Sequence, residues 1–135
     1  MASGRTLAEL KRDFDAQPSA FADYEVRLCE LERGKIELEQ RIEQRVLVML
    51  KSGLVEEVRA LQAMGLKQNP SAASAIGYRE TIAVIEGLAP ANELVGQIVK
   101  NTRALVKKQR TWFKTQLPEH RVLDAATATV EALFG

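Results

Sequence analysis

Residues 91–117 read ANELVGQIVKNTRALVKKQRTWFKTQL, and their periodicity predicts the longest helix of the chain. Within it, residues 100–114 carry six basic side chains and no acidic one, whereas the whole chain of 135 residues is nearly neutral, with 19 Lys and Arg against 18 Asp and Glu. A local excess of charge on a balanced chain indicates a local anionic partner. Thr, Gln and Trp are interleaved with the basic residues, which favours RNA over a membrane surface because Gln and Thr can reach base or sugar edges.

The same spacing also fits a helix that binds nothing. The basic residues at positions 100, 103, 107, 110 and 114 recur every three or four residues, so they would line one solvated face of the helix. On periodicity alone, an RNA-binding face and a solvated face both remain open.

Outside this segment the sequence predicts further helices and at most two short strands. Hydrophobic periodicity, a capping box and well-placed glycines define the helices, while alternating apolar and polar residues define the first strand. The fold class is therefore mainly α with one or two short β-strands. The expected helices cover residues 6–14, 36–51, 54–64, 73–86 and 124–134, and the expected strands cover 24–31 and 122–123.

Three local predictions can be checked directly against a structure. Tyr24, Val26 and Leu28 alternate with polar residues, so the first strand should bury one face. The helix over residues 73–86 should be interrupted or strained near Gly77. Asp124 should cap the last helix.

Composition excludes several classes of protein. The longest apolar run has five residues, 46–50, far short of the roughly 20 that cross a bilayer, so we expect a soluble, cytoplasmic protein without membrane contact. The single cysteine, Cys29, cannot form an internal disulfide, which fits a reducing compartment. With one Cys and one His in the chain, we expect no metal site and no nucleophilic cysteine.

Several motifs stand in a fixed order along the chain. SGRTLAEL at residues 3–10 is followed by RIEQR at 41–45, AIGYRE at 75–80 and KKQRTWFK at 107–114. Together they resemble the carboxyl-terminal half of the tRNA dimethylallyltransferases, the IPP transferase family, which prenylate an adenine beside the anticodon. The resemblance implies that residues 1–135 form a single partial domain, the carboxyl-terminal part of a P-loop-type α/β fold that is incomplete as an independent domain.

The resemblance also points to parts of the family that this sequence does not contain. The amino-terminal half of the family supplies a phosphate-binding loop and a general-base Asp. A P-loop requires two glycines five residues apart, then Lys and Ser or Thr. The only Gly-Lys pair, Gly34-Lys35, is followed by Ile36, and Cys29 stands where the first glycine should be. We therefore expect no cofactor on this chain alone, while magnesium and the substrate dimethylallyl diphosphate are implied for the complete enzyme.

Two arginines form the first candidate site. Arg41 and Arg45 are four residues apart, so both guanidinium groups lie on one side of a helix, where they could grip a phosphate. Alternatively, Arg41 pairs with Glu37, and Arg45 pairs with Glu39 or Glu43, as surface salt bridges. The resemblance implies that Arg41 and Arg45 bind pyrophosphate and that Arg45 is catalytic, stabilising the charge that builds on the pyrophosphate of dimethylallyl diphosphate.

A loop around Gly77 forms the second candidate site. Gly77 permits close backbone approach, Tyr78 offers a stacking face and Arg79 a phosphate contact, although Ile76 and Tyr78 would otherwise be core residues. The resemblance implies that this loop touches tRNA. The residues assigned to it are Ser74, Ala75, Ile76, Gly77, Tyr78 and Arg79.

The basic segment of the longest helix is the third candidate site. It resembles the family segment Lys-Arg-Gln-x-Thr-Trp-Phe-Arg, with Lys108 and Lys114 in place of arginines, which keeps the charge but loses the planar fork. Trp112 and Phe113 fall in register with Leu105 and Val106, so periodicity predicts that they belong to the core. The resemblance assigns tRNA contacts to Lys107, Lys108, Gln109, Arg110, Thr111, Trp112, Phe113 and Lys114.

The implied reaction is transfer of a dimethylallyl group from its diphosphate to N6 of adenine 37 in tRNA. This chain would supply the tRNA-contacting part and the pyrophosphate arginine, and is expected to be inactive alone. The implied partners are the tRNA anticodon stem-loop and either a separate amino-terminal P-loop half or a second copy of the chain. Two alternatives are a non-catalytic tRNA-binding module and a structural, oligomerising truncated remnant.

Overall fold

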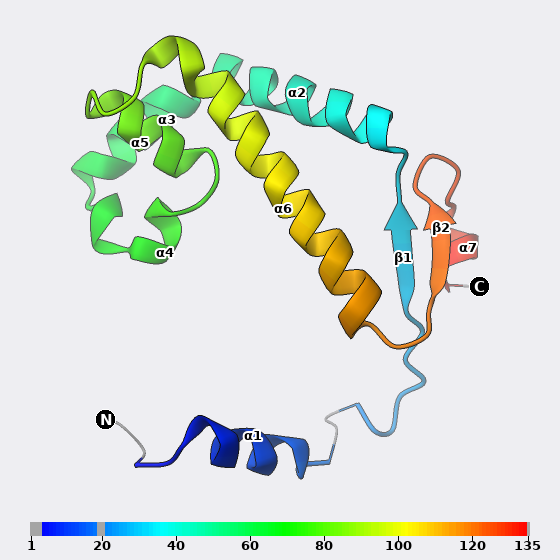
Figure 1. Cartoon of the computed structure of the whole chain (residues 1–135). Coiled ribbons are helices and arrows are strands. Elements are labelled where there is room, and N and C mark those ends of the chain that lie inside the picture. Colours follow the sequence, from blue (N-terminus) through cyan, green and yellow to red (C-terminus); the bar gives the residue numbers. More distant parts are fainter. Residues whose placement is uncertain (1–3, 19–20, 135) are drawn as a thin grey trace.

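The structure is a computed structural model that describes residues 4–18 and 21–134 (Figure 1); Ser3, where the resemblance begins, lies outside these residues. It confirms a mainly helical chain with two short strands. Most predicted helices appear close to their expected bounds, and two 3-10 turns are added. The elements are α1 (Leu7–Asp15), β1 (Cys29–Glu32), α2 (Lys35–Lys51), α3 (Leu54–Ala63), η1 (Leu66–Gln68), α4 (Pro70–Ala73), α5 (Tyr78–Ile85), η2 (Ala91–Glu93), α6 (Leu94–Gln116), β2 (Arg121–Asp124) and α7 (Val130–Phe134).

The core lies where the helices α2, α3, α5 and α6 meet. Apolar residues at helical spacing bring one face of each helix together, and α6 packs mainly against α2 and α5 (Figure 1). Val58 of α3 and Ile98 of α6 are 0% and 1% exposed, so both lie at the centre of this cluster. The buried core consists of Ile42, Val46, Leu54, Val58, Leu66, Ile82, Leu94, Ile98 and Val99.

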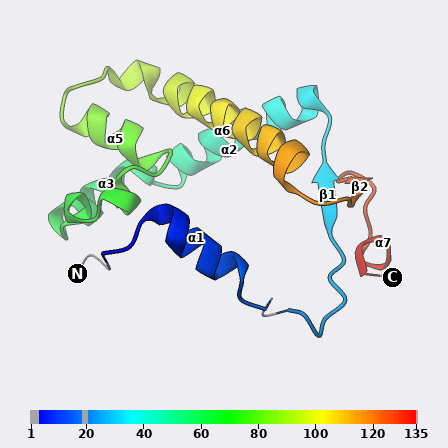
Figure 2. The same cartoon turned by 60° about the horizontal axis from the view of Figure 1, so that its bottom comes forward.

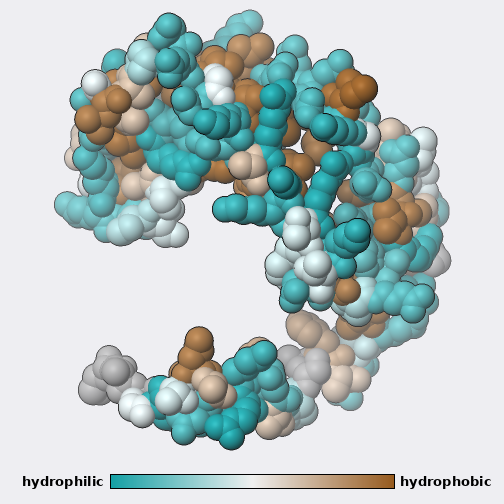
Figure 3. Space-filling view, viewed as in Figure 1, coloured by the Kyte–Doolittle hydropathy of each residue, from teal (hydrophilic) through white to brown (hydrophobic). Residues whose placement is uncertain are grey.

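Helix α1 takes no part in this core. The capping box that its sequence predicts is confirmed, because Thr6 Oγ1 accepts from the Glu9 amide at 3.3 Å and Glu9 Oε2 accepts from the Thr6 amide at 2.7 Å. Its apolar stripe is nevertheless exposed: Leu7 is 85% and Phe14 75% accessible. Both cartoons draw α1 apart from the helical cluster, and the space-filling view shows apolar side chains on the side of α1 that faces it (Figures 1, 2 and 3).

The two strands form a small parallel sheet, in which Cys29 pairs with Arg121 and Glu32 with Asp124. The prediction of a strand over residues 24–31 with a buried face was wrong for its first half. Residues 25–28 have no regular structure, and Tyr24 and Val26 are 71% and 70% exposed. The physical reason is that β2 has only four residues, so its register with the first segment covers only Cys29–Glu32. Before Cys29, the Leu28 carbonyl still accepts from the Arg121 amide at 3.3 Å.

Two further predictions concern helix ends. The predicted helix over residues 73–86 is interrupted, as expected, because α4 ends at Ala73 and Gly77 has a φ of 98° before α5 begins. Asp124 was wrongly predicted to cap the last helix. It ends β2 and accepts from the Ala126 amide at 2.8 Å, which closes a turn, whereas Thr129 accepts from the Ala132 amide at the start of α7.

His120 links the turn before β2 to β1, and this link makes stability depend on pH. His120 Nδ1 lies 2.7 Å from the Pro118 carbonyl oxygen, and Nε2 lies 3.1 Å from Glu30 Oε2. The Pro118 carbonyl, and then Glu30, raise the pKa of His120 above its usual 6.5. The stabilisation is therefore complete below pH 6.5 and is lost as the pH rises through the folded-state pKa.

The proton resonances of His120, the only histidine of the chain, give this pKa directly. We expect a titration midpoint above 6.5 that moves down in the variant Glu30→Gln, because the variant removes the carboxylate charge. A midpoint at or below 6.5 in the unaltered chain would contradict the ion pair.

Candidate active site and nucleic-acid interface

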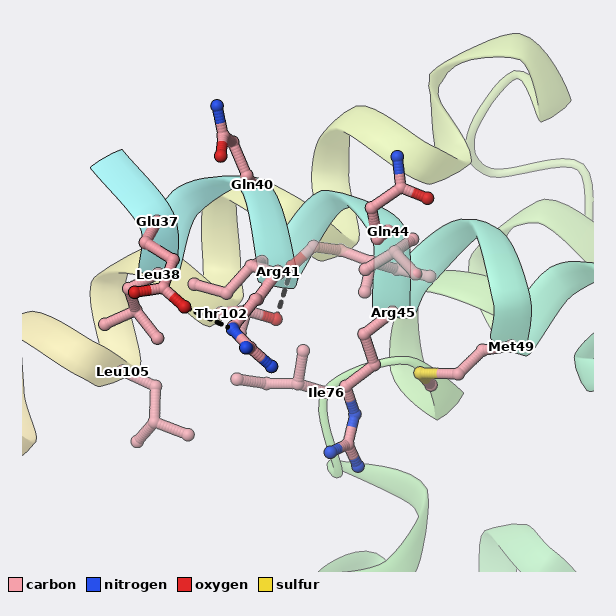
Figure 4. Close-up of a pocket in the computed structure, with 13 residues that line it drawn as sticks. Glu37, Leu38, Gln40, Arg41, Gln44, Arg45, Met49, Ile76, Thr102 and Leu105 are labelled. Atoms are coloured by element: carbon pink, nitrogen blue, oxygen red, sulfur yellow. Dashed lines mark hydrogen bonds and ion pairs between the residues drawn. The ribbon is translucent and has the colours of Figure 1, made fainter. Parts of the chain in front are cut away.

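A cavity of about 880 Å³ opens between α2 and α6, beside the loop that precedes α5 (Figure 4). Its apolar lining comes from the faces of the two helices that also build the core, and polar side chains of α2 stand at its edge. The packing of Ile42 and Val46, 7% and 2% exposed, fixes the rotation of α2 and so aims its polar residues at the cavity. The cavity is lined by Glu37, Leu38, Gln40, Arg41, Ile42, Gln44, Arg45, Val46, Met49, Ile76, Ile98, Thr102 and Leu105.

Arg45 reaches this cavity from α2. Figure 4 shows its guanidinium group extending away from α2 toward the loop that carries Ile76. Among the described residues, no hydrogen-bond or ion-pair partner is found for it. The predicted pairing with Glu39 or Glu43 was wrong, because Glu43 Oε1 instead accepts from Arg103 Nη2 of α6 at 2.7 Å. The five donors of Arg45 are therefore free for an anion.

Arg41 is in a different state, although it lies one turn away on the same face. Its Nε donates to Glu37 Oε1 at 2.9 Å, the salt bridge that spacing predicts. Arg33 donates to the same oxygen. The hydrogen bond from Arg41 is the largest of the effects that lower the pKa of Glu37, so Glu37 is ionised at neutral pH. Arg41 is thus partly neutralised, and Arg45 is the stronger candidate for binding an anionic group.

Two of the predicted tRNA-contacting residues lie where the loop before α5 meets the helix. Ile76 lines the cavity, while Tyr78 packs against the core and donates its hydroxyl to Glu57, which raises the pKa of Tyr78. Ile76 and Tyr78 therefore occupy the core positions of the alternative prediction, and RNA contact at the loop stays a prediction. Gly77 is buried, and a Cβ added to it would meet Met49 Cε at 3.4 Å. Ser74 Oγ donates to the Ser71 carbonyl at 3.0 Å.

The basic segment occupies the far end of α6. Lys107, Lys108 and Lys114 are exposed and pair with no acidic side chain among the described residues. Gln109 is also exposed. Arg110 is different, because its Nη2 donates to the Arg33 carbonyl at 2.9 Å and ties α6 to the end of β1. The three lysines therefore offer free charge, while Arg110 also has a structural contact.

The aromatic pair of this segment divides between surface and core. Trp112 is 54% exposed, so the prediction that it belongs to the core was wrong, whereas Phe113 is partly buried near Leu31 and Val106. Phe113 lines a pocket together with residues of β1, whereas Trp112 lines none of the described pockets of this region. The two rings meet edge to face, with centroids 5.7 Å apart.

The structure does not gather all predicted residues in one place. Arg41, Arg45 and Ile76 share the cavity, but the basic segment starts beyond it, and Lys114 lies about 18 Å along the helix from Thr102 at 1.5 Å per residue. Sequence reasoning missed Thr102 and Leu105 as cavity residues. Their spacing from Ile98, four and seven residues, would have placed them on the same helical face.

The described residues contain neither a cluster of metal ligands nor a membrane-spanning helix. No group of three His, Cys, Asp or Glu side chains in this part of the chain could hold a metal ion. No described helix is long and apolar enough to cross a membrane.

Comparison with known proteins identifies the family. The family model described as IPP transferase matches residues 1–116. The chain belongs to the IPP transferase family. A tRNA dimethylallyltransferase of Opitutus terrae is 62% identical over 126 residues, which cover 93% of this chain and 41% of that protein. A tRNA dimethylallyltransferase of Chlamydia caviae is 38% identical over 136 residues, which cover 98% of this chain and 39% of that protein. The chain thus spans about two fifths of the length of these relatives.

Solved structures of the family have the same fold. A tRNA isopentenylpyrophosphate transferase from Staphylococcus epidermidis matches 95% of this chain and 40% of its own, with a TM-score of 0.72 and 27% identity. The structure of the full-length tRNA isopentenylpyrophosphate transferase from Bacillus halodurans matches 73% of this chain over 32% of its own length. Its TM-score is 0.67, and the identity is 28%. The mainly helical arrangement with its small parallel sheet is therefore a fold found within these larger IPP transferases.

Proposed function

We propose that this chain supplies the tRNA-contacting and pyrophosphate-binding part of a tRNA dimethylallyltransferase. The reaction transfers a dimethylallyl group from dimethylallyl diphosphate to N6 of adenine 37 in tRNA. Family membership supports the reaction class, since the relatives compared are tRNA dimethylallyltransferases. The observation that carries the proposal is the unpaired guanidinium of Arg45 at the cavity between α2 and α6.

Arg45 has a clear role in such a reaction. As the allylic carbon–oxygen bond breaks, its electron pair leaves with the pyrophosphate, and negative charge grows on that group. A guanidinium already aimed at this position stabilises the charge without reorganising during the reaction. The apolar side chains of the cavity, among them Met49 and Ile76, provide surface for a branched hydrocarbon group.

The basic segment of α6 would hold the tRNA. Its three unpaired lysines suit backbone phosphates, because an ammonium group binds phosphate as a point charge without reading sequence. Trp112, which is exposed, offers a face on which an unstacked base could rest. The loop that contains Gly77, together with Arg79 in the first turn of α5, would contact the anticodon region beside the amino-terminal half of α6. A role in tRNA modification would place the protein in the cytoplasm.

We further propose that residues 1–135 are a single partial domain that does not catalyse transfer alone. The sequence has no P-loop pattern, and the exposed stripe of α1 offers apolar surface for another part of the enzyme or a second copy. Magnesium, which the resemblance implies for the complete enzyme, finds no fitting group of ligands among the described residues, so no step is assigned to it.

Incubation of the chain with unmodified tRNA and labelled dimethylallyl diphosphate tests whether the chain binds tRNA without catalysing the transfer. We expect binding of the anticodon stem-loop without transfer of label, because a general base alone contributes about 10²- to 10⁴-fold. Transfer by the chain alone would contradict its proposed dependence on another part. Failure to bind the stem-loop would contradict the tRNA-contacting role and favour a structural one.

A further inference from the structure

Glu80 is the only charged side chain that is buried in the described part of the chain, with 8% of its surface exposed. It lies in the first turn of α5 and accepts three hydrogen bonds. Oε2 accepts from the Gly77 amide at 2.7 Å, and Oε1 accepts from Arg79 Nε and Asn101 Nδ2, both at 2.6 Å. A buried carboxylate needs hydrogen bonds to replace those it would make with water, and both oxygens of Glu80 accept them.

The three donors come from different parts of the candidate interface. Gly77 belongs to the loop that borders the cavity, Arg79 is 46% exposed, and Asn101 precedes the cavity residue Thr102 on α6. Thr81 Oγ1 also donates to the Gly77 carbonyl at 2.6 Å, so both polar groups of this glycine are held by side chains of α5. One buried carboxylate therefore sets the position of the loop and of Arg79 relative to α6.

We propose that Glu80 is a positioning residue for RNA binding, which holds the guanidinium group of Arg79 and the Gly77 loop in the orientation that contacts the anticodon stem-loop. This inference rests on the proposed tRNA-contacting function. Arg79 uses its Nε for Glu80, and its two Nη groups make no hydrogen bond with the described residues. They remain available for a phosphate oxygen in the paired arrangement that arginine favours.

The charge of Glu80 is maintained despite its burial. Burial raises the pKa of Glu80, but the hydrogen bonds from Arg79, the Gly77 amide and Asn101 outweigh it, so the pKa lies below 4.5. Glu80 is thus an acceptor at both oxygens at neutral pH. Glutamine has a single acceptor oxygen, and its NH₂ group would face a donor in at least one of the three contacts.

The test measures binding of a fluorescent anticodon stem-loop RNA to the full chain. We expect Glu80→Gln to weaken binding about tenfold and to lower the slope of log affinity against log salt by about one unit, as for a lost phosphate contact. The control is Glu86→Gln at the other end of α5, which also alters an acidic side chain with two partners, Lys67 and Gln62. Glu86→Gln should leave affinity and slope unchanged.

Two double variants show whether Glu80 acts through its partners. If it acts through Arg79, the double variant Glu80→Gln with Arg79→Ala binds no more weakly than Arg79→Ala alone. Glu80→Gln combined with Asn101→Asp should restore most of the affinity. The glutamine oxygen accepts from Gly77, its NH₂ donates to the new carboxylate, and that carboxylate lies beside Arg79 Nε, so it can replace the acceptor that Arg79 has lost. Each measurement is made below the melting transition of the variant, so that a loss of folding is not read as a loss of binding.

Each outcome bears on the inference. Unchanged affinity in Glu80→Gln would overturn it, as would fully additive losses with Arg79→Ala. If Glu80→Gln does not fold, the double variant with Asn101→Asp decides: a folded variant with tight binding supports the inference, and one with weak binding overturns it. If the unaltered chain binds no stem-loop, the proposed function fails and this inference fails with it, whereas RNA binding that is insensitive to Glu80 overturns the inference alone.

Discussion

Replacing Arg45 by alanine is expected to reduce dimethylallyl transfer to tRNA by about 10²- to 10³-fold, as for loss of one oriented charge donor. The measurement uses a chimera in which this chain replaces the 126 matched residues of the Opitutus terrae enzyme. The large effect follows from the position of Arg45, whose charge is unpaired at the cavity. The loss should appear in kcat, because the guanidinium acts on charge that develops during bond breaking.

Two companion variants show whether the effect is specific to Arg45. Arg41→Ala should cost less, since its guanidinium is already shared with Glu37. Arg59→Ala, which removes an exposed arginine of α3 away from the cavity, should leave turnover unchanged. Full activity of the Arg45→Ala chimera would remove Arg45 from its catalytic role.

Replacing Lys107, Lys108 and Lys114 together by alanine is expected to weaken tRNA binding strongly at low salt. Each lysine that contacts a phosphate releases a counterion on binding, so the slope of log affinity against log salt should flatten by about two to three units. These three lysines have no acidic partner among the described residues, so their removal should leave the thermal melting temperature nearly unchanged. Arg110 is left intact because it also holds the Arg33 carbonyl.

The control replaces three exposed basic residues elsewhere, Lys11, Lys51 and Arg59, by alanine. This variant has the same net charge as the first, so it separates local contact from overall charge. Equal slopes for the two triple variants would mean that the lysines of α6 form only a solvated face, which was the alternative that periodicity left open.

The helices could be predicted from the sequence because their signals are local. The apolar stripe of α2 and the capping box at Thr6 lie within a few residues of the structure they determine. Strands differ in this respect, since pairing depends on a distant segment. Residues 25–28 alternate as a strand should, but β2 has four residues, and its register with β1 begins only at Cys29.

In the candidate site, too, local motifs are visible in the sequence, whereas long-range contacts are not. Motif order marks Arg41 and Arg45, but their different states depend on contacts that lie outside the motif. Glu43 is bonded by Arg103, 60 residues away on α6, and as a residue two positions from Arg45 on α2 it does not face Arg45. Similarly, the role of Glu80 depends on Asn101, which local sequence does not connect with it. Long-range side-chain partners are what sequence patterns alone leave undetermined.

The most direct test of the central claim is whether the unaltered chimera modifies tRNA. Label transfer from dimethylallyl diphosphate to the anticodon loop is compared between the intact Opitutus terrae enzyme and the chimera, in which every residue of the matched region comes from this chain. The account predicts transfer by the chimera at a rate within about tenfold of the intact enzyme, because two sequences that are 62% identical over this region are expected to share its fold and most of its packing. A chimera that is folded and binds dimethylallyl diphosphate but leaves tRNA unmodified would contradict it.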